Sequence, residues 1–304
     1  MKIALGIDIG GTNTKLALVD ESGKTMDYLS FSTNADQKFE FFLKNLSLHV
    51  DKLLKNHSNI QLSGIGVGCP NVDARTGKLV SPPNLGWGNI DIQKAFEKTF
   101  KGPIFFGNDA NVAALGEKIW GHGQKFTDFI VVTLGTGVGT GAFINNKLVI
   151  GGNGLATEGG HIITHDNGRK CLCGGEGHLE CYASIRGIKQ TVKELSGEDL
   201  KFREIAEMFK AGHPMAKQAF KLTAESLAKG LSIMGSLLAP EAFILSGGIA
   251  TIGEDFLKDV KETYEKLVFP NFRKQTQIYI SEIATEHGAV LGAAAQVFFH
   301  QTKF

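Results

Sequence analysis

The chain has 304 residues, which exceeds the size at which a single hydrophobic core is usual, so we expect two domains. Its hydrophobic content of 42% is ordinary for a globular protein, and its formal net charge of +1 argues against a nucleic-acid or membrane-surface partner. No apolar run approaches the roughly 20 residues that span a bilayer, and the N-terminal stretch lacks the pattern of a secretion signal, so we expect a cytoplasmic protein.

The first hundred residues predict a β-meander followed by alternating helices and strands. Strands are indicated by alternating apolar residues, and helices by apolar residues three and four positions apart. In chain order the expected elements are strands at 2–9, 14–20 and 28–32, a helix at 37–56, a strand at 62–67, a helix at 91–100 and a strand at 103–106. This order is typical of one half of a mixed-sheet α/β protein.

A second half begins near residue 129 and repeats the opening hairpin. Gly10 aligns with Gly135 and Ala17 with Ala142, an offset of 125 residues both times. The remaining expected elements are helices at 202–211 and 215–238, a strand at 243–246, a helix at 253–267, a strand at 277–281 and a small-residue helix at 286–299. We therefore predict two similar α/β halves that face each other across a cleft.

Both hairpin turns are rich in glycine and threonine, and such turns present backbone N–H groups that suit phosphate oxygens. The alternative is a pair of tight hairpins with no ligand. A Walker loop is excluded because G-x-x-x-x-G-K-[ST] is absent, and the spacing of Gly137, Gly139 and Ala142 precedes a strand rather than the helix of a dinucleotide fold. A third turn, Ser246–Gly248, follows a strand and is a weaker candidate for contact with a nucleotide.

Two aspartates stand next to these features. Asp8 ends a buried strand directly before the first turn, where a carboxylate could hold hydrated Mg²⁺ together with substrate phosphates. Asp109 follows a strand and begins a helix, so it could be an N-cap or a general base. Because no serine–histidine or cysteine nucleophile arrangement is evident, removal of a hydroxyl proton by Asp109 is the simplest chemistry for the chain.

Residues 158–181 contain three of the four cysteines and three of the nine histidines. Thiolates and imidazoles at this spacing suit a four-coordinate zinc ion, with Cys171 and Cys173 completed by His161 and His178. The alternative is a redox-active or free pair of cysteines in a glycine-rich loop. Glu158 and Glu180 flank this predicted zinc site, and we expect them to bind a ligand there.

Together these residues resemble the ROK family of sugar kinases and repressors, which has the actin, hexokinase and heat-shock-70 ATPase-like fold. The resemblance spans essentially the whole chain and is carried by D-I-G-G-T-N-T-K at 8–15, G-V-G-C-P at 66–70, P-N-L-G-W at 83–87, G-N-D-A-N-V-A-A at 107–114, L-G-T-G-V-G-T-G at 134–141, E-G-G-H at 158–161, C-x-C-G-x-x-G-H-L-E at 171–180 and S-G-G at 246–248. It implies two ribonuclease H-like α/β domains facing a cleft, with duplicated β-hairpin phosphate loops. The implied domains are a small one at 1–109 plus 286–304 and a larger one at 110–285, which holds the zinc-binding loop 161–181.

The resemblance also implies an ATP-dependent hexose kinase with glucose as substrate, Asp109 as general base, Mg²⁺ bound with ATP at Asp8, a structural zinc ion and a homodimer. The implied sugar ligands are Asn84, Asn108, Asp109, Glu158, His161 and Glu180. The implied ATP and phosphate ligands are Asp8, Gly10, Gly11, Thr12, Asn13, Lys15, Gly135, Thr136, Gly137, Gly247 and Gly248. The implied zinc ligands are His161, Cys171, Cys173 and His178.

Three departures from the family pattern matter. His178 replaces the third zinc cysteine, and Cys181 is close enough to compete with it; Asn71 replaces the glycine that usually follows the proline. The chain starts at its phosphate loop, so we do not expect the DNA-binding segment with which the repressors begin. Two alternatives stay open: a kinase for N-acetylglucosamine, N-acetylmannosamine, fructose or allose, and a non-catalytic sugar-sensing protein of the same fold.

Overall fold

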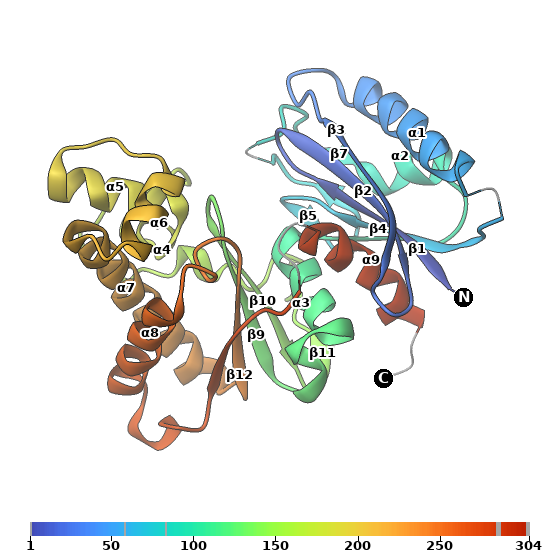
Figure 1. Ribbon diagram of the computed structural model, residues 1–304. Coiled ribbons are helices and arrows are strands. Elements are labelled where there is room, and N and C mark those ends of the chain that lie inside the picture. Colours follow the sequence, from blue (N-terminus) through green and yellow to red (C-terminus); the bar gives the residue numbers. More distant parts are fainter. Residues whose placement is uncertain (1, 58, 83, 284–286, 302–304) are drawn as a thin grey trace. The chain divides into compact units, whose positions relative to one another are not determined.

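The computed structural model describes residues 2–57, 59–82, 84–283 and 287–301 (Figure 1). The chain divides into two compact units. The first consists of Met1–Lys125, Asn146–Thr157 and Glu282–Phe304, and the second of Phe126–Asn145 and Glu158–Ser281. Within the described residues, every helix falls short of the length or the apolar character that a membrane crossing requires.

The sheet of the first unit joins an antiparallel meander to parallel strands. Its order is β3 (Thr25–Ser32), β2 (Asn13–Asp20), β1 (Ile3–Ile9), β4 (Leu62–Gly68) and β8 (Ile104–Gly107). β1, β4 and β8 are mutually parallel, and their register pairs Asp8 with Gly68 and Gly68 with Gly107. The carboxyl ends of these three strands therefore lie side by side, at the edge of the sheet where α/β proteins place ligands.

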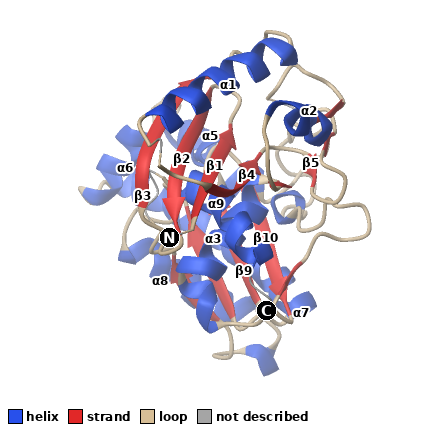
Figure 2. Cartoon of the chain, turned by 90° about the vertical axis from the view of Figure 1, so that its right-hand side faces the viewer, coloured by secondary structure: helices blue, strands red, loops and turns tan. Residues whose placement is uncertain are grey.

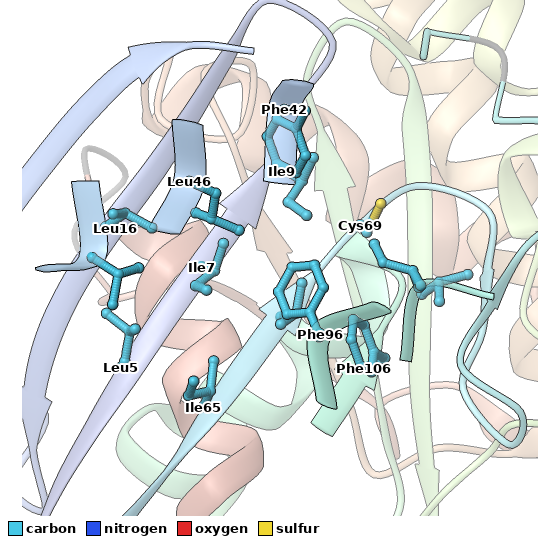
Figure 3. Close-up of a cluster of buried hydrophobic side chains, with 14 of the residues drawn as sticks. Leu5, Ile7, Ile9, Leu16, Phe42, Leu46, Ile65, Cys69, Phe96 and Phe106 are labelled. Atoms are coloured by element: carbon cyan, nitrogen blue, oxygen red, sulfur yellow. The ribbon is translucent and has the colours of Figure 1, made fainter. Parts of the chain in front are cut away.

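Alternating side chains give this sheet two apolar faces, each covered by helices. On one face, Leu5, Ile7 and Ile9 of β1 pack with Phe42 and Leu46 of α1 (Phe39–Lys55), as Figure 3 shows. Figure 2 shows α1 lying along the strands of the meander, and α2 (Ile92–Thr99) adds Phe96 to the same core. On the other face, α9 (Gly288–Gln301) packs on the sheet and on α3 (Asp109–Trp120).

The contact between α9 and the sheet depends on small residues. A Cβ atom on Gly66 would lie 1.8 Å from the carbonyl oxygen of Ala293, and one on Gly6 would lie 2.2 Å from that of Val290. On the helix, a Cβ on Gly292 would lie 2.4 Å from the carbonyl oxygen of Val112 in α3. The predicted helix with the pattern G-A-V-L-G-A-A-A thus packs back on the N-terminal residues; its predicted first residue, 286, lies outside the described residues.

The second unit repeats this plan. β9 (Phe129–Leu134) and β10 (Val138–Ile144) form an antiparallel hairpin, and β12 (Ala242–Ser246) and β13 (Gln277–Ile280) extend the sheet in parallel with β9. The predicted duplication of a β-hairpin at the start of each half is therefore present. The helices of this unit are α4 (Glu180–Ala183), α5 (Ile185–Ser196), α6 (Phe202–Lys210), α7 (Pro214–Leu238) and α8 (Glu254–Leu267).

Several short elements were not expected from the sequence. The loop after β4 contains a small antiparallel sheet, and further short segments occur in both units. They are β5 (Val72–Asp73), β6 (Lys78–Leu79), β7 (Ile90–Asp91), β11 (Lys147–Leu148) and the 3₁₀ helices His122–Lys125, Gly159–His161 and Pro270–Phe272. The long elements agree with the predicted ones to within a few residues, whereas α4 and α5 had no predicted counterpart.

The observed units differ from the predicted domain ranges of 1–109 plus 286–304 and 110–285. The first unit includes α3, because this helix packs on α9, and it also includes Asn146–Thr157. Residues 284–286 and 302–304 of the predicted ranges lie outside the described residues. That the two halves face each other across a cleft stays a prediction.

Candidate active site and metal centre

In the first unit, Asp8 is the next-to-last residue of β1 and Asp109 lies two residues after the end of β8, so both stand at the aligned carboxyl ends of these strands. Burial raises the pKa of Asp8 to about 6, Lys15 opposes this rise, and the charge of Asp109 adds to it. Lys15 is the hairpin partner of Asp8 in β2, and its Nζ lies 4.0 Å from Asp8 Oδ2. Burial, with the charges of Asp109 and Asp8, also raises the pKa of the Cys69 thiol at the end of β4. Two carboxyl groups are thus held in one poorly solvated corner of the sheet.

The first residue of α3 is Asp109, but the side chain that caps this helix belongs to Asn108. Asn108 Oδ1 accepts a hydrogen bond of 2.7 Å from the N–H of Asn111, as an N-cap does. Asp109 Oδ1 accepts the neighbouring N–H of Ala110, at 3.0 Å, and burial raises the pKa of Asp109. Because Asn108 already caps the helix, the position of Asp109 is not explained by capping.

The first glycine turn is hydrogen-bonded to the residue that follows a neighbouring strand. Gly10 N–H donates to the carbonyl oxygen of Asn13 at 3.1 Å, and Thr33 binds the turn twice, through Oγ1 to Gly10 O and through its N–H to Thr12 O. A Cβ on Gly11 would lie 2.8 Å from the carbonyl oxygen of Asn84. The predicted phosphate turn and the predicted sugar ligand Asn84 are therefore adjacent within one unit.

Asn71, which stands where the family pattern has glycine, keeps the backbone conformation that glycine favours. Its φ is +53°, in the left-handed region that asparagine tolerates better than most residues. Its carbonyl oxygen accepts from the N–H of Val80, and its Nδ2 donates to Val80 O. The departure from the family pattern thus leaves the turn after the proline intact.

In the second unit, the other two glycine turns lie against each other. Gly135 N–H donates to the carbonyl oxygen of Gly137 at 3.0 Å and closes the hairpin turn. Gly247 has φ of +93°, and a Cβ on it would lie 2.4 Å from Leu134 O, so only glycine permits the third turn to approach the end of β9. Gly247 and Gly248 are thereby brought to the predicted phosphate turn of this unit.

The start of α5 supports the hairpin turn and supplies positive charge. Ile185 N–H donates to Gly135 O at 2.8 Å. Thr136 lines a pocket of about 800 Å³ together with three cations of α5, Arg186, Lys189 and Lys193, and with the acids Glu194 and Asp199. These cations were not predicted from the sequence, because α5 itself was not. Their signal was present in the helical spacing of Ile185, Ile188, Val192 and Leu195.

Four predicted metal ligands converge in the loop before α4. One ligand atom each from His161, Cys171, Cys173 and His178 lies within 4.8 Å of all the others. The Nδ1 atoms of the two histidines are 3.4 Å apart, Cys173 Sγ lies 3.3 Å from His178 Nδ1, and Cys171 Sγ lies 3.9 Å from His161 Nδ1. The Sγ of Cys181 instead lies 3.7 Å from the carbonyl oxygen of Lys170.

This donor set fits a zinc ion. Bonds of about 2.0–2.3 Å to nitrogen and sulfur in a tetrahedron place neighbouring ligand atoms roughly 3.3–3.8 Å apart. The three separations given above are 3.4, 3.3 and 3.9 Å, and every pair lies within 4.8 Å. Burial raises the pKa of the Cys171 thiol to about 11, and a divalent cation is what stabilises a thiolate in such surroundings. The four residues therefore have both the chemistry and the spacing of a closed structural site.

Glu158 and Glu180 flank this cluster in different ways. Glu158 Oε2 lies 4.0 Å from His161 Nε2, the ring nitrogen that faces away from the cluster. Glu180 Oε1 lies 3.8 Å from Cys171 Sγ and accepts a hydrogen bond of 2.7 Å from Arg186 Nη2. Its Oε2 accepts the N–H of Val138, beside the glycine turn, at 3.2 Å. Glu180 thus connects the cluster to the phosphate turn as well as flanking it.

The predicted site residues therefore form two groups, one on each unit. The first unit brings together Asp8, Lys15, the turn Gly10–Asn13, Asn84, Asn108 and Asp109. The second brings together Gly135, Thr136, Gly137, Gly247, Gly248, Glu158, His161, Glu180 and the three remaining metal ligands.

Comparison with known proteins identifies this arrangement. The model of the ROK family matches residues 4–299. A glucokinase of Halalkalibacterium halodurans is 31% identical over 95% of this chain and 93% of its own length. A xylose repressor of Caldicellulosiruptor bescii is 28% identical over 99% of this chain and 79% of its own length.

Solved structures agree. The crystal structure of a ROK family glucokinase from Streptomyces griseus, in complex with glucose and AMPPNP, is 29% identical, and it matches with a TM-score of 0.83 over 97% of this chain and 98% of that one. The chain belongs to the ROK family and has the actin- and hexokinase-like fold of its kinases. The predicted family and fold class are confirmed.

Proposed function

We propose that the chain is an ATP-dependent hexose kinase that converts glucose to glucose 6-phosphate. The observation that carries this proposal is the placement of Asp109 beside Asp8 at the aligned strand ends, with the capping role taken by Asn108. A buried carboxylate with a raised pKa, at the start of a helix that it does not cap, suits a general base. The glucokinases among the relatives support the choice of reaction and of sugar.

In the proposed reaction, Asp109 accepts the proton of the primary hydroxyl while the hydroxyl oxygen attacks the γ-phosphorus of ATP. The bond from that phosphorus to the β,γ-bridging oxygen breaks, and ADP leaves. Phosphoryl transfer needs positioning and charge stabilisation more than covalent chemistry from the protein. We assign the sugar hydroxyls to Asn84, Asn108 and Asp109 of the first unit and to Glu158, His161 and Glu180 of the second. The two hairpin turns supply backbone N–H groups to the phosphates.

Two metal ions complete the proposal. Asp8 would hold Mg²⁺, which supplies neutralisation of phosphate charge when bound. His161, Cys171, Cys173 and His178 would hold zinc, which when bound fixes the loop that carries these ligands between Glu158 and Glu180. We place the nucleotide in the second unit, where Arg186 and Lys189 line the pocket beside Thr136. We also propose a homodimer, which a measurement of the molar mass in solution would test.

The test is formation of ADP from ATP and Mg²⁺ with a panel of sugars: glucose, N-acetylglucosamine, N-acetylmannosamine, fructose and allose. Glucose should give the highest kcat/KM, and 6-deoxyglucose, which lacks the primary hydroxyl, should bind without being phosphorylated. A higher kcat/KM for another hexose would support the proposed kinase activity and replace glucose as the proposed substrate. Sugar binding by calorimetry with no ADP from any sugar would favour a sugar-sensing protein, the alternative that the repressor relatives support.

A further inference from the structure

Helix α9 carries one buried polar side chain in an otherwise apolar stretch. Residues 290–298 of this helix are buried valine, leucine, glycine, alanine and phenylalanine, except for Gln296, whose exposed fraction is 2%. A buried amide costs free energy unless its hydrogen bonds are made, whereas an apolar side chain of similar size would pack here without that cost. The hydrogen bonds of Gln296 should therefore explain why this position carries a polar residue.

Gln296 lies beneath the last residues of two parallel strands. Its Nε2 donates to the carbonyl oxygen of Val67 in β4 at 3.1 Å and lies 3.3 Å from that of Ala293. A Cβ on Gly107, the last residue of β8, would lie 3.0 Å from Gln296 Oε1, and one on Gly66 would lie 3.4 Å from its Nε2. The absence of side chains at these two glycines lets the amide lie directly against both strands.

These strand ends lead straight into the proposed catalytic corner. Gly107 is followed at once by Asn108 and Asp109, and Val67 stands two residues before Cys69. The N–H of Cys69 donates to Gly107 O at 3.0 Å, so the two strand ends are also tied to each other. A shift of Gly107 would consequently be passed to Asp109, two residues further along the backbone, and a shift of Val67 would reach Gly107 through the Cys69 hydrogen bond.

We propose that Gln296 is a positioning residue that holds the ends of β4 and β8 in register and thereby fixes Asp109. The structural part of this proposal stands on the contacts alone, while its kinetic part rests on the proposed kinase function. Reaction rates are sensitive to displacement of a catalytic group by an ångström or less, so loss of the amide should appear in turnover before it appears in binding.

The chain offers a matched control in the same helix. Gln301 also donates from Nε2 to a carbonyl oxygen of β4, that of Ser63, at 3.0 Å. Ser63 lies near the other end of the strand, away from Asp109, and Gln301 is exposed. Gln296→Met and Gln301→Met thus each remove one amide-to-β4 hydrogen bond with little change in side-chain volume.

The experiment compares these variants by steady-state kinetics with glucose, by thermal melting, and by hydrogen exchange of peptides that cover residues 104–112. Gln296→Met should lower kcat about tenfold with KM for glucose changed by less than about twofold, and it should speed exchange at residues 107–112. Gln296→Glu keeps the shape of the side chain, and because burial favours the protonated carboxyl it can still donate to Val67 O. Its kcat should therefore lie between that of the wild type and that of Gln296→Met. Gln301→Met should keep kcat within about twofold and leave this exchange unchanged.

Equal kcat and equal exchange in Gln296→Met and Gln301→Met would overturn the proposal. A lowered melting temperature of Gln296→Met with wild-type kcat and exchange would also overturn it, because Gln296 would then contribute to stability without positioning Asp109. Should the wild-type chain form no ADP with any sugar, the proposed function fails and the exchange at 107–112 alone decides the role of Gln296.

Discussion

His161 faces Glu158 with the ring nitrogen that points away from the His/Cys cluster: Nε2 lies 4.0 Å from Glu158 Oε2, while Nδ1 lies 3.4 Å from His178 Nδ1. A cation bound at Nδ1 would fix the tautomer and the plane of the ring, and with them the direction in which Nε2 meets the carboxylate. The cluster should therefore orient a proposed sugar ligand as well as stabilise the loop.

Metal analysis of the purified protein should find about one zinc per chain. Cys171→Ser and Cys173→Ser should each lose zinc and weaken glucose binding, because the ligand set is then incomplete and His161 loses its fixed orientation. Cys181→Ser is the control and should keep zinc, since the Cys181 sulfur faces Lys170 O. Inductively coupled plasma analysis and calorimetry provide the measurements; full glucose affinity in metal-free protein would refute this site.

His178→Cys should retain zinc. A thiolate and an imidazole nitrogen are both good zinc ligands, and position 178 already places its side chain 3.3 Å from Cys173 Sγ. His178→Ala should lose the metal under the same conditions. If His178→Ala kept its zinc and Cys181→Ser lost it, Cys181 would be the fourth ligand instead.

Asp109→Asn should preserve the fold and glucose binding while lowering kcat by about 10²–10⁴, the usual contribution of a positioned general base. Asp51→Asn, at an exposed position of α1, is the matched control and should keep wild-type turnover. Initial rates at saturating glucose and ATP give the comparison, with melting temperatures to verify folding. Retention of more than roughly a tenth of wild-type kcat would show that Asp109 is not the base.

Stability should depend on pH through Asp8. Its pKa is raised from 3.8 to about 6 in the folded protein, so between these values the folded state holds a proton that the unfolded state has released. The contribution to stability is present below pH 3.8 and is lost as pH rises through about 6. Asp8→Asn should therefore raise the free energy of unfolding, relative to the wild type, more at pH 7 than at pH 4. The difference between the two pH values should be up to about 3 kcal/mol.

Urea titrations without Mg²⁺ at the two pH values measure this difference. Asp20→Asn is a control of opposite sign, because hydrogen bonds led by that of the Ser22 hydroxyl lower the pKa of Asp20. Its substitution should destabilise at pH 7, with an effect that fades as pH falls through the lowered pKa. An Asp8→Asn effect that is the same at pH 4 and pH 7 would contradict the assigned burial of Asp8.

Gly66→Ala should destabilise the first unit by about 3 kcal/mol, because the added methyl group would overlap Ala293 O and force α9 away from the sheet. Gly152→Ala, where nothing lies within 4 Å of the added carbon, should change stability by less than about 0.5 kcal/mol. Urea unfolding of both variants tests the close contact. Similar stabilities for the two would mean that α9 does not pack so tightly.

Local patterns were sufficient for much of the fold. The alternation in β1 and β2 predicted a hairpin, and the structure pairs Asp8 with Lys15 across it. A local signal also existed for α5, in the helical spacing of its apolar residues. Ser184 caps this helix through the N–H of Gly187, and its C-cap Gly197 has φ of +78°. Periodicity would therefore have predicted this helix too.

Contacts between distant segments could not be predicted in this way. Gly11 meets Asn84, and Glu180 binds Val138, across 73 and 42 residues of chain, and no local periodicity specifies such neighbours. The choice between His178 and Cys181 was open for the same reason. It depends on α4, which places the Cys181 sulfur against Lys170 O and leaves His178 with the cluster.

The helix that covers one face of the first sheet is synthesised after every residue of the second unit. α9 supplies Val290, Ala294 and Val297 to the cluster that contains Ala4 and Ala17, so this core stays open until residues 288–301 have been made. By then all residues of the second unit are available to fold. The unit that is synthesised first thus completes its core last. Until then its uncovered apolar face is open to aggregation.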